Sequence, residues 1–195
     1  MLPSALPPFW SMMIWGLVAT VAMTTVLQGA QGLGLSRLSL PFLAGTFFTG
    51  DRRWAVIVGF VFYVVGGWLF AFLYFVLFAS LGLYTWWLGL AAGLLHGLFL
   101  LAAALPLLPY IHPRMASEYD GASTVRHLEP PGFMGLNYGH RTPLTTLAGQ
   151  AVYGMALGGL PQRGPLEPGT ALLARAAPIT PGRRCGSRAR PRPSA

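Results

Sequence analysis

Four long apolar runs constrain this chain of 195 residues more than any other feature. They cover residues 10–33, 54–80, 86–108 and 142–160, and none of them contains Asp, Glu, Lys or Arg. An uncharged apolar run of about 18 residues is long enough to cross a bilayer as a helix. Because backbone polar groups in lipid must bond within the chain, the runs predict an all-α, polytopic bundle of four transmembrane helices.

Aromatic residues and prolines predict where these helices end. Trp10, Trp54 and Trp86 stand at the beginnings of three runs, and indole rings favour the headgroup level of a membrane. Pro106 and Pro109 predict the end of the third helix, because proline cannot continue the helical hydrogen bonding. The fourth run is the shortest and the least apolar of the four.

The connections between the runs differ in character. Residues 34–53 include SLPFLAGTFF, in which Ser39 could cap a short surface helix with Pro41 in its first turn. Residues 109–141 form a polar loop, rich in Pro and Gly, that is too long to be a mere turn. We expect a transmembrane domain over residues 1–160 and a disordered tail, rich in Arg and Pro, over residues 161–195.

All thirteen basic residues are arginine, and seven of them lie in the tail. The absence of lysine and the abundance of Ala, Gly and Pro suggest a bacterial, GC-rich coding sequence, and hence the bacterial inner membrane. Because most of the charge lies outside the apolar domain, we expect the lipid bilayer, and no nucleic acid, as partner. Arginines close to the membrane favour cytoplasmic long loops and external termini, whereas counting the whole tail leaves the orientation open.

Each run carries a stripe of small or polar residues at four-residue spacing, which would let helices approach closely in lipid. The third run has Gly89, Gly93 and Gly97, and the fourth has Gln150, Gly154 and Gly158. The first run includes Thr20, Thr24 and Gln28 in its stripe, and the second reads Gly59, Tyr63, Gly67 and Ala71. Gln28 and Gln150 line either a polar path or, as we favour, a hydrogen-bonded contact between the first and fourth helices.

His96 is the one histidine inside a run, and a residue that can carry charge inside a membrane span is a candidate for function. A haem with two histidine ligands would need a second histidine at the same depth, and no other run contains one. We therefore expect no cofactor, and a neutral His96 that bonds a threonine, Gln28 or Gln150. A role in proton handling or ligand binding is the alternative, with Tyr153 as a further intramembrane polar candidate.

The long polar loop gathers side chains that could ligate a divalent ion, but in no compact pattern. The weak candidates are His112, Glu118, Asp120, His127 and His140. No G-x-S-x-G, H-E-x-x-H or P-loop pattern occurs, so we name no catalytic residue and no metal site. Cys185 is the only cysteine, which excludes an intrachain disulfide.

Three segments together resemble an uncharacterised bacterial family of small four-helix integral membrane proteins, defined by a domain of unknown function. They are GLVATVAMT, GLLHGLFLLAAALPLLPYIHPRM and PGFMGLNYGHRTPLTTLAGQAVYGMALG, within residues 14–160. The resemblance implies a fold and a location but no activity. It also implies a histidine in relatives where Gln150 stands here, just before Tyr153, so that a pair with His96 would be missing.

Three functions remain as hypotheses. The first is a non-enzymatic membrane protein, either a self-associating bundle (a homo-oligomer) or an accessory subunit of a membrane complex. The second is a small transporter or channel whose polar path uses His96, Gln28 and Gln150. The third is a metal-binding membrane enzyme that uses the loop over residues 109–141.

Overall fold

A computed structural model describes residues 8–116 and 127–159 of the chain. Within these residues the regular elements are helices, and one isolated β-bridge joins Met115 to Leu128. Three helical stretches are long and apolar enough to cross a membrane: Phe9–Gly32, Arg52–Leu81 and Trp86–Ile111. The predicted all-helical fold is thus confirmed, with three candidate spans, whereas the predicted disordered tail lies outside the described residues.

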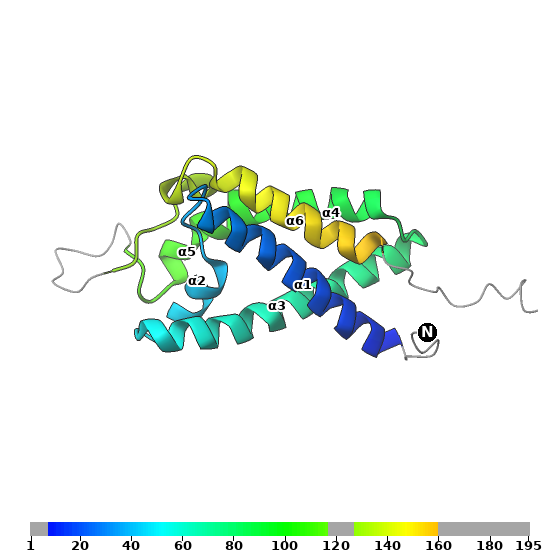
Figure 1. Cartoon of the computed structure of the whole chain (residues 1–195), viewed down its shortest axis with the longest axis horizontal. Coiled ribbons are helices and arrows are strands. Elements are labelled where there is room, and N and C mark those ends of the chain that lie inside the picture. The colour runs from blue at the N-terminus through cyan, green and yellow to red at the C-terminus, as the bar shows by residue number, and fades with distance from the viewer. Residues whose placement is uncertain (1–7, 117–126, 160–195) are drawn as a thin grey trace, which may run out of the picture. The chain divides into compact units, whose positions relative to one another are not determined.

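The long helical segments run back and forth between the two ends of the bundle (Figure 1). They are α1 (Pro8–Gly32), α3 (Arg52–Leu81), α4 (Trp86–Phe99) with its continuation, and α6 (Thr142–Gly159). Their bounds lie within three residues of the predicted ones. Both long connections therefore lie at one end, which also carries the short helix α2 (Leu40–Thr46).

Local signals set both ends of α3. The Asp51 carboxylate accepts hydrogen bonds from the backbone N–H groups of Arg53 and Trp54, at 2.9 and 3.0 Å. These bonds satisfy donors that the first turn of a helix leaves unpaired. At the other end Gly82 adopts a left-handed conformation with φ of 63°, which glycine reaches without strain. The chain then turns sharply into α4.

The third span extends beyond its predicted end, because the helix continues through both prolines. After α4 comes a π-helical segment, Leu100–Ala104, and then α5 (Leu105–Ile111), which contains Pro106 and Pro109. Pro106 has no N–H to offer the carbonyl of Ala102, four residues earlier. The π-helical segment lies where this bond is missing, so the chain passes the proline without leaving the helix.

The predicted short helix in the first connection is present as α2, with Pro41 in its first turn. Ser39 occupies the position before the helix, but its side chain makes no capping bond. The helix is held instead by close contact with the start of α3. A Cβ atom on Gly45 would overlap the carbonyl of Ala55, and one on Gly59 would overlap the carbonyl of Pro41.

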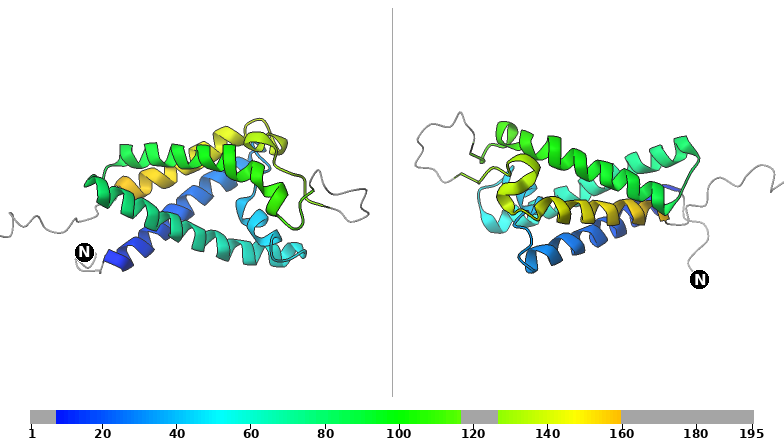
Figure 2. Two further views of the ribbon diagram at one scale, coloured as in Figure 1. Left: turned by 180° about the vertical axis from the view of Figure 1, so that it is seen from behind. Right: turned by 90° about the horizontal axis from the view of Figure 1, so that it is seen from above.

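Helix α6 is the most enclosed of the long helices, because α1 and α4 both lie alongside it (Figure 2). More than half of its 18 residues are buried. This position explains why its sequence is the least apolar of the four runs. A helix surrounded by other helices meets little lipid and can carry threonine and glutamine in its contacts.

The contact between α4 and α6 is made by backbone atoms. A Cβ atom on Gly89 would overlap the carbonyl oxygen of Gly154, and one on Gly154 would overlap the carbonyl of Gly89. Gly93 lies against the carbonyl of Gln150 in the same way, and Gly158 against that of Thr85. The glycines of both stripes therefore pack α4 against α6 within one chain.

Because of this contact, we expect Gly89→Leu to destabilise the bundle by about 1–3 kcal/mol, the usual cost of overpacking. Ala91→Leu is the matched control, since Ala91 lies exposed on the same helix. Reversible unfolding in mixed micelles measures both variants. Equal stability of the two proteins would show that α4 and α6 do not meet at Gly89.

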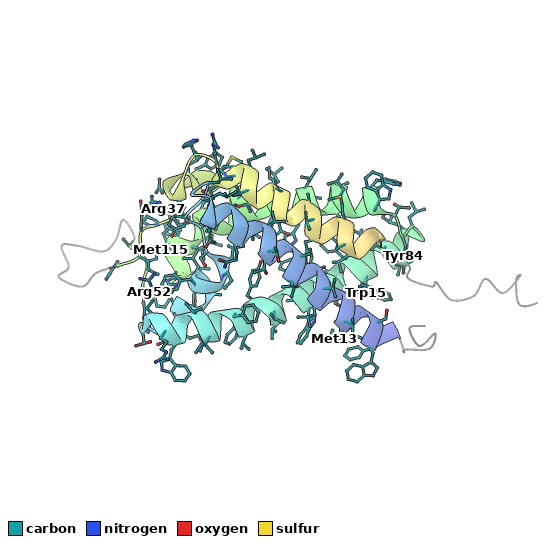
Figure 3. All side chains as sticks on the ribbon, viewed as in Figure 1. Met13, Trp15, Arg37, Arg52, Tyr84 and Met115 are labelled. Carbon is teal, nitrogen blue, oxygen red and sulfur yellow. The ribbon has the colours of Figure 1, made fainter. Side chains whose placement is uncertain are left out.

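The two ends of the bundle differ in charge. Arg37, Arg52 and Met115 lie at the end with the long connections, whereas Met13 and Tyr84 lie towards the opposite end (Figure 3). In the part of the chain that the structure describes, every arginine lies in or beside the connections at the first end: Arg37, Arg52, Arg53, Arg114 and Arg141. We refer to this end as the arginine end.

Candidate functional site

His96 lies on α4 and meets two aromatic side chains of α3. Its ring is stacked at a tilt on Phe70, with 4.0 Å between ring centroids. Its Nδ1 lies 3.4 Å from the hydroxyl oxygen of Tyr74. The structure thus gives His96 a tyrosine partner, where the sequence led us to expect a threonine or a glutamine. Its Nε2 atom is buried, with no hydrogen-bond partner among the described residues.

Tyr153 ties α6 to α3. Its buried hydroxyl donates a hydrogen bond of 2.5 Å to the backbone carbonyl of Gly67, where α3 lies against Thr20 of α1. The Tyr153 ring meets Tyr74 edge to face, with centroids 5.6 Å apart. His96, Tyr74 and Tyr153 therefore form one cluster contributed by three helices, which we call the tyrosine–histidine cluster.

Tyr74, the residue at the centre of this cluster, was not predicted from the sequence. A signal was present, because Tyr74 follows Ala71 by three residues and so shares the face of the Gly67–Ala71 stripe on α3. That face is buried, since Gly67, Ala71, Tyr74 and Phe78 are all buried in the bundle. What the stripe could not reveal is which residue of α4 lies opposite.

Gln150 and Thr146 are buried one turn apart on α6. The Cβ and Cγ atoms of Gln150 lie where α4 passes, 3.1 and 3.3 Å from the position of a Cβ on Gly97. The Oε1 atom of Gln150 and the Oγ1 atom of Thr146 have no hydrogen-bond partner in the described part of the chain. A buried oxygen without a donor costs free energy, so these two atoms stand out as sites where a polar group could bind.

Gln28 does not lie with the other predicted polar residues. It is exposed on α1, whereas Gln150 is buried against α4. The contact of α1 with α6 is apolar at this level, since Met23 and Leu27 lie against Gly149. The expected hydrogen-bonded contact between the first and fourth helices is therefore replaced by apolar side chains on glycine.

The hydrogen bond of Tyr153 yields a test of the cluster. We expect Tyr153→Phe to lower the free energy of unfolding by about 1 kcal/mol, because one interhelical hydrogen bond in a membrane is worth roughly 0.6–1.7 kcal/mol. Tyr84→Phe, at the turn before α4, is the control and should be close to neutral. An unchanged stability for Tyr153→Phe would contradict the bond to Gly67.

His112 holds α2 against the end of the third span. Its Nδ1 accepts a hydrogen bond from the backbone N–H of Arg114, at 3.2 Å. The proton of the neutral ring therefore belongs on Nε2, which lies 3.3 Å from the carbonyl of Leu43 and 3.3 Å from the hydroxyl of Thr46. Protonation of Nδ1 would put two N–H groups face to face.

Arg114 completes this link at the end of α2. Its guanidinium donates hydrogen bonds to the carbonyls of Thr46 and Phe47, at 2.8 and 3.0 Å. These carbonyls belong to the last turn of the helix and the residue after it, where a cation is favourable. The loop residues His112 and Arg114 thus have structural partners within the chain.

Burial lowers the pKa of His112, and the nearby charge of Arg114 lowers it further, although the carbonyl of Leu43 opposes the shift. The unfolded chain therefore binds a proton at His112 more readily than the folded chain does. Stability should then fall as the pH drops through the ordinary histidine pKa of about 6.5.

Thermal unfolding as a function of pH tests this expectation. His112→Gln should reduce the loss of stability in acid, whereas His140→Gln, at an exposed position, should leave the pH dependence of the wild type unchanged. An identical pH profile for wild type and His112→Gln would show that His112 is not responsible.

Among the described residues, the candidate metal ligands do not form a metal site. Within residues 8–116 and 127–159, no group of three His, Cys, Asp or Glu side chains could hold a metal ion. His112 is buried, and His140 is exposed. Glu118 and Asp120 lie outside the described residues.

The comparisons with known proteins add no relative. No protein-family model, curated protein or solved structure matches this chain.

Proposed function

We propose that the chain is a non-enzymatic, multi-pass protein of the bacterial inner membrane in which α6 is a fourth span. Helix α6 has 18 residues, a length of about 27 Å at 1.5 Å per residue, close to the roughly 30 Å of a bilayer core. It lies alongside α1 and α4, both candidate spans. These neighbours provide the apolar surroundings that its own sequence provides least.

The charge asymmetry supports an orientation with the arginine end in the cytoplasm. Arginine near the membrane is retained on the cytoplasmic side, and five arginines lie at this end among the described residues. The turn between α3 and α4, at the opposite end, contains no charged residue. Both long connections would then be cytoplasmic, as the arginines close to the membrane led us to expect.

Cysteine labelling in cells tests this orientation. In a Cys185→Ser background, Leu83→Cys in the α3–α4 turn should react with a membrane-impermeant thiol reagent added outside the inner membrane. His140→Cys at the arginine end should react only after the membrane is made permeable. The reverse pattern would contradict the orientation.

We further propose that the protein works by association with itself, through the outer face of α3. The observation that carries this proposal is Gly66. A Cβ atom there would meet nothing within 4 Å, whereas one on Gly67 would overlap Thr20. In the most apolar 18-residue stretch of α3 only 17% of the residues are buried, whereas in that of α1 33% are buried. The side chains around Gly66 on this face are about half exposed: Phe62, Leu69 and Leu73.

A small residue on an open helix face lets a second helix approach closely in lipid. The glycines of α4 and α6 cannot serve in this way, because they face each other. The open face of α3 is therefore the proposed association face.

Disulfide cross-linking in native membranes tests this face. In a Cys185→Ser background, Gly66→Cys should yield a covalent dimer on mild oxidation. Leu95→Cys, on the exposed face of α4, should not. A photo-cross-linker at Leu69 that captures a different membrane protein would replace self-association by an accessory-subunit role. A monomer alone in both experiments would exclude both.

A second candidate function is a small transporter or channel with a polar path near His96. Three buried atoms that have no hydrogen-bond partner among the described residues favour it: His96 Nε2, Gln150 Oε1 and Thr146 Oγ1. Water at these atoms would make Ala92→Cys, one turn from His96, reactive towards a hydrophilic thiol reagent. Leu95→Cys faces outward on the same helix and should stay unreactive. Inaccessibility of Ala92→Cys from both sides would reject a water-filled path.

A further inference from the structure

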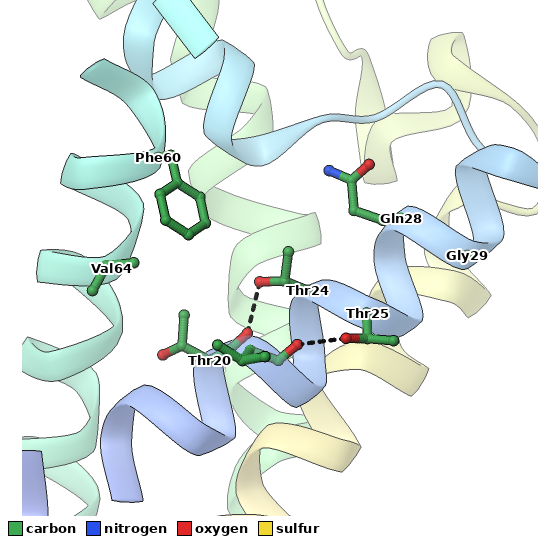
Figure 4. Close-up of a pocket in the computed structure, with 8 residues that line it drawn as sticks. Thr20, Thr24, Thr25, Gln28, Gly29, Phe60 and Val64 are labelled. Carbon is green, nitrogen blue, oxygen red and sulfur yellow. Dashed lines mark hydrogen bonds between the residues drawn. The ribbon is translucent and has the colours of Figure 1, made fainter. Parts of the chain in front are cut away.

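A pocket lies between α1 and α3 (Figure 4). Its volume is about 480 Å³, within the range of small-molecule sites. It is lined by Thr20, Val21, Thr24, Thr25, Gln28, Gly29, Phe60 and Val64. Because both walls belong to candidate membrane-spanning helices, the pocket lies at the depth of lipid chains.

The pocket is more apolar than its threonines suggest. The hydroxyls of Thr20, Thr24 and Thr25 donate hydrogen bonds to backbone carbonyls one turn earlier in α1, at 2.7, 2.6 and 2.9 Å. Hydroxyls bonded in this way are satisfied and leave little polarity to a ligand. Together with Val21, Phe60 and Val64, they form a surface suited to a hydrocarbon chain.

Polarity increases along the pocket towards the arginine end. Gln28 lies four residues before the end of α1, about 6 Å along the helix, whereas Thr20 lies about 18 Å from that end. The exposed amide of Gln28 is therefore near the membrane surface, and Thr20 is near mid-depth. This arrangement matches an amphipathic ligand with its head at the arginine end.

The charges at that end indicate the sign of the head. Arg52 and Arg53 are exposed at the start of α3, and the exposed indole of Trp54 beside them is typical of the headgroup level. Phe60 lies eight residues beyond Arg52, about 12 Å deeper along the helix. A phosphate at these arginines would thus place its acyl chain at the depth of the pocket.

From these observations we infer that the pocket binds one acyl chain of an anionic phospholipid, whose phosphate lies at Arg52 and Arg53. The inference does not depend on self-association through α3, because Gly66 is not among the residues that line the pocket. It would make the protein selective for anionic lipid at a defined place, rather than merely surrounded by it.

The test uses full-length protein in phosphatidylcholine vesicles that contain a trace of phosphatidylglycerol with a diazirine on its acyl chain. After irradiation, mass spectrometry should locate the label at the pocket-lining residues of α1 and α3. A phosphatidylcholine probe with the same diazirine should label them less. Arg52→Gln and Arg53→Gln together should lower labelling by the anionic probe about 30-fold, because each arginine near the surface contributes about fivefold.

A matched pair of variants separates the pocket from general lipid contact. Val21→Trp fills the pocket and should reduce labelling there, whereas Val18→Trp, exposed on the same helix outside the pocket, should not. Val64→Trp closes the pocket from α3 and serves if Val21→Trp fails to fold. Equal labelling by both probes, or equal effects of Val21→Trp and Val18→Trp, would overturn the inference. A cross-link to a protein at the pocket would also overturn it.

Discussion

The contact between the backbones of α4 and α6 is the interaction on which the rest of the structure depends. Lipid gives two apolar helices no hydrophobic reason to associate, so they need close packing or hydrogen bonds. Gly89 and Gly154 remove the side chains that would hold the backbones apart. A side chain at either position would overlap the backbone of the facing helix.

This contact fixes the position of α6, and α6 in turn organises the other helices. From its central place it meets α1 through Gly149 and reaches α3 through the hydroxyl of Tyr153. The same geometry brings Tyr74 to His96, since α3 and α4 both border the buried side of α6. Only a small part of α3 is buried against the other helices. Both the Gly66 face and the pocket beside α1 are therefore left open.

The features that could be predicted from sequence are those set by short stretches of chain. Apolar length predicted the helices, and Pro41 predicted the first turn of α2. The continuation past Pro106 was not predicted, because it depends on a π-helical segment that relieves the proline. Likewise the partner of His96 depends on the angle at which α3 crosses α4. Residue spacing within one helix does not determine that angle. Gln28 and Gln150 share a residue type and differ in burial for the same reason.

Hydrogen–deuterium exchange of the protein in a lipid bilayer tests the central position of α6 most directly. With α6 packed against α4 through glycine and spanning the membrane, its amides should exchange as slowly as those of α4, although its sequence is the least apolar. Rapid exchange along Thr142–Gly159, with slow exchange in α4, would contradict the proposal that α6 is a fourth span packed against α4.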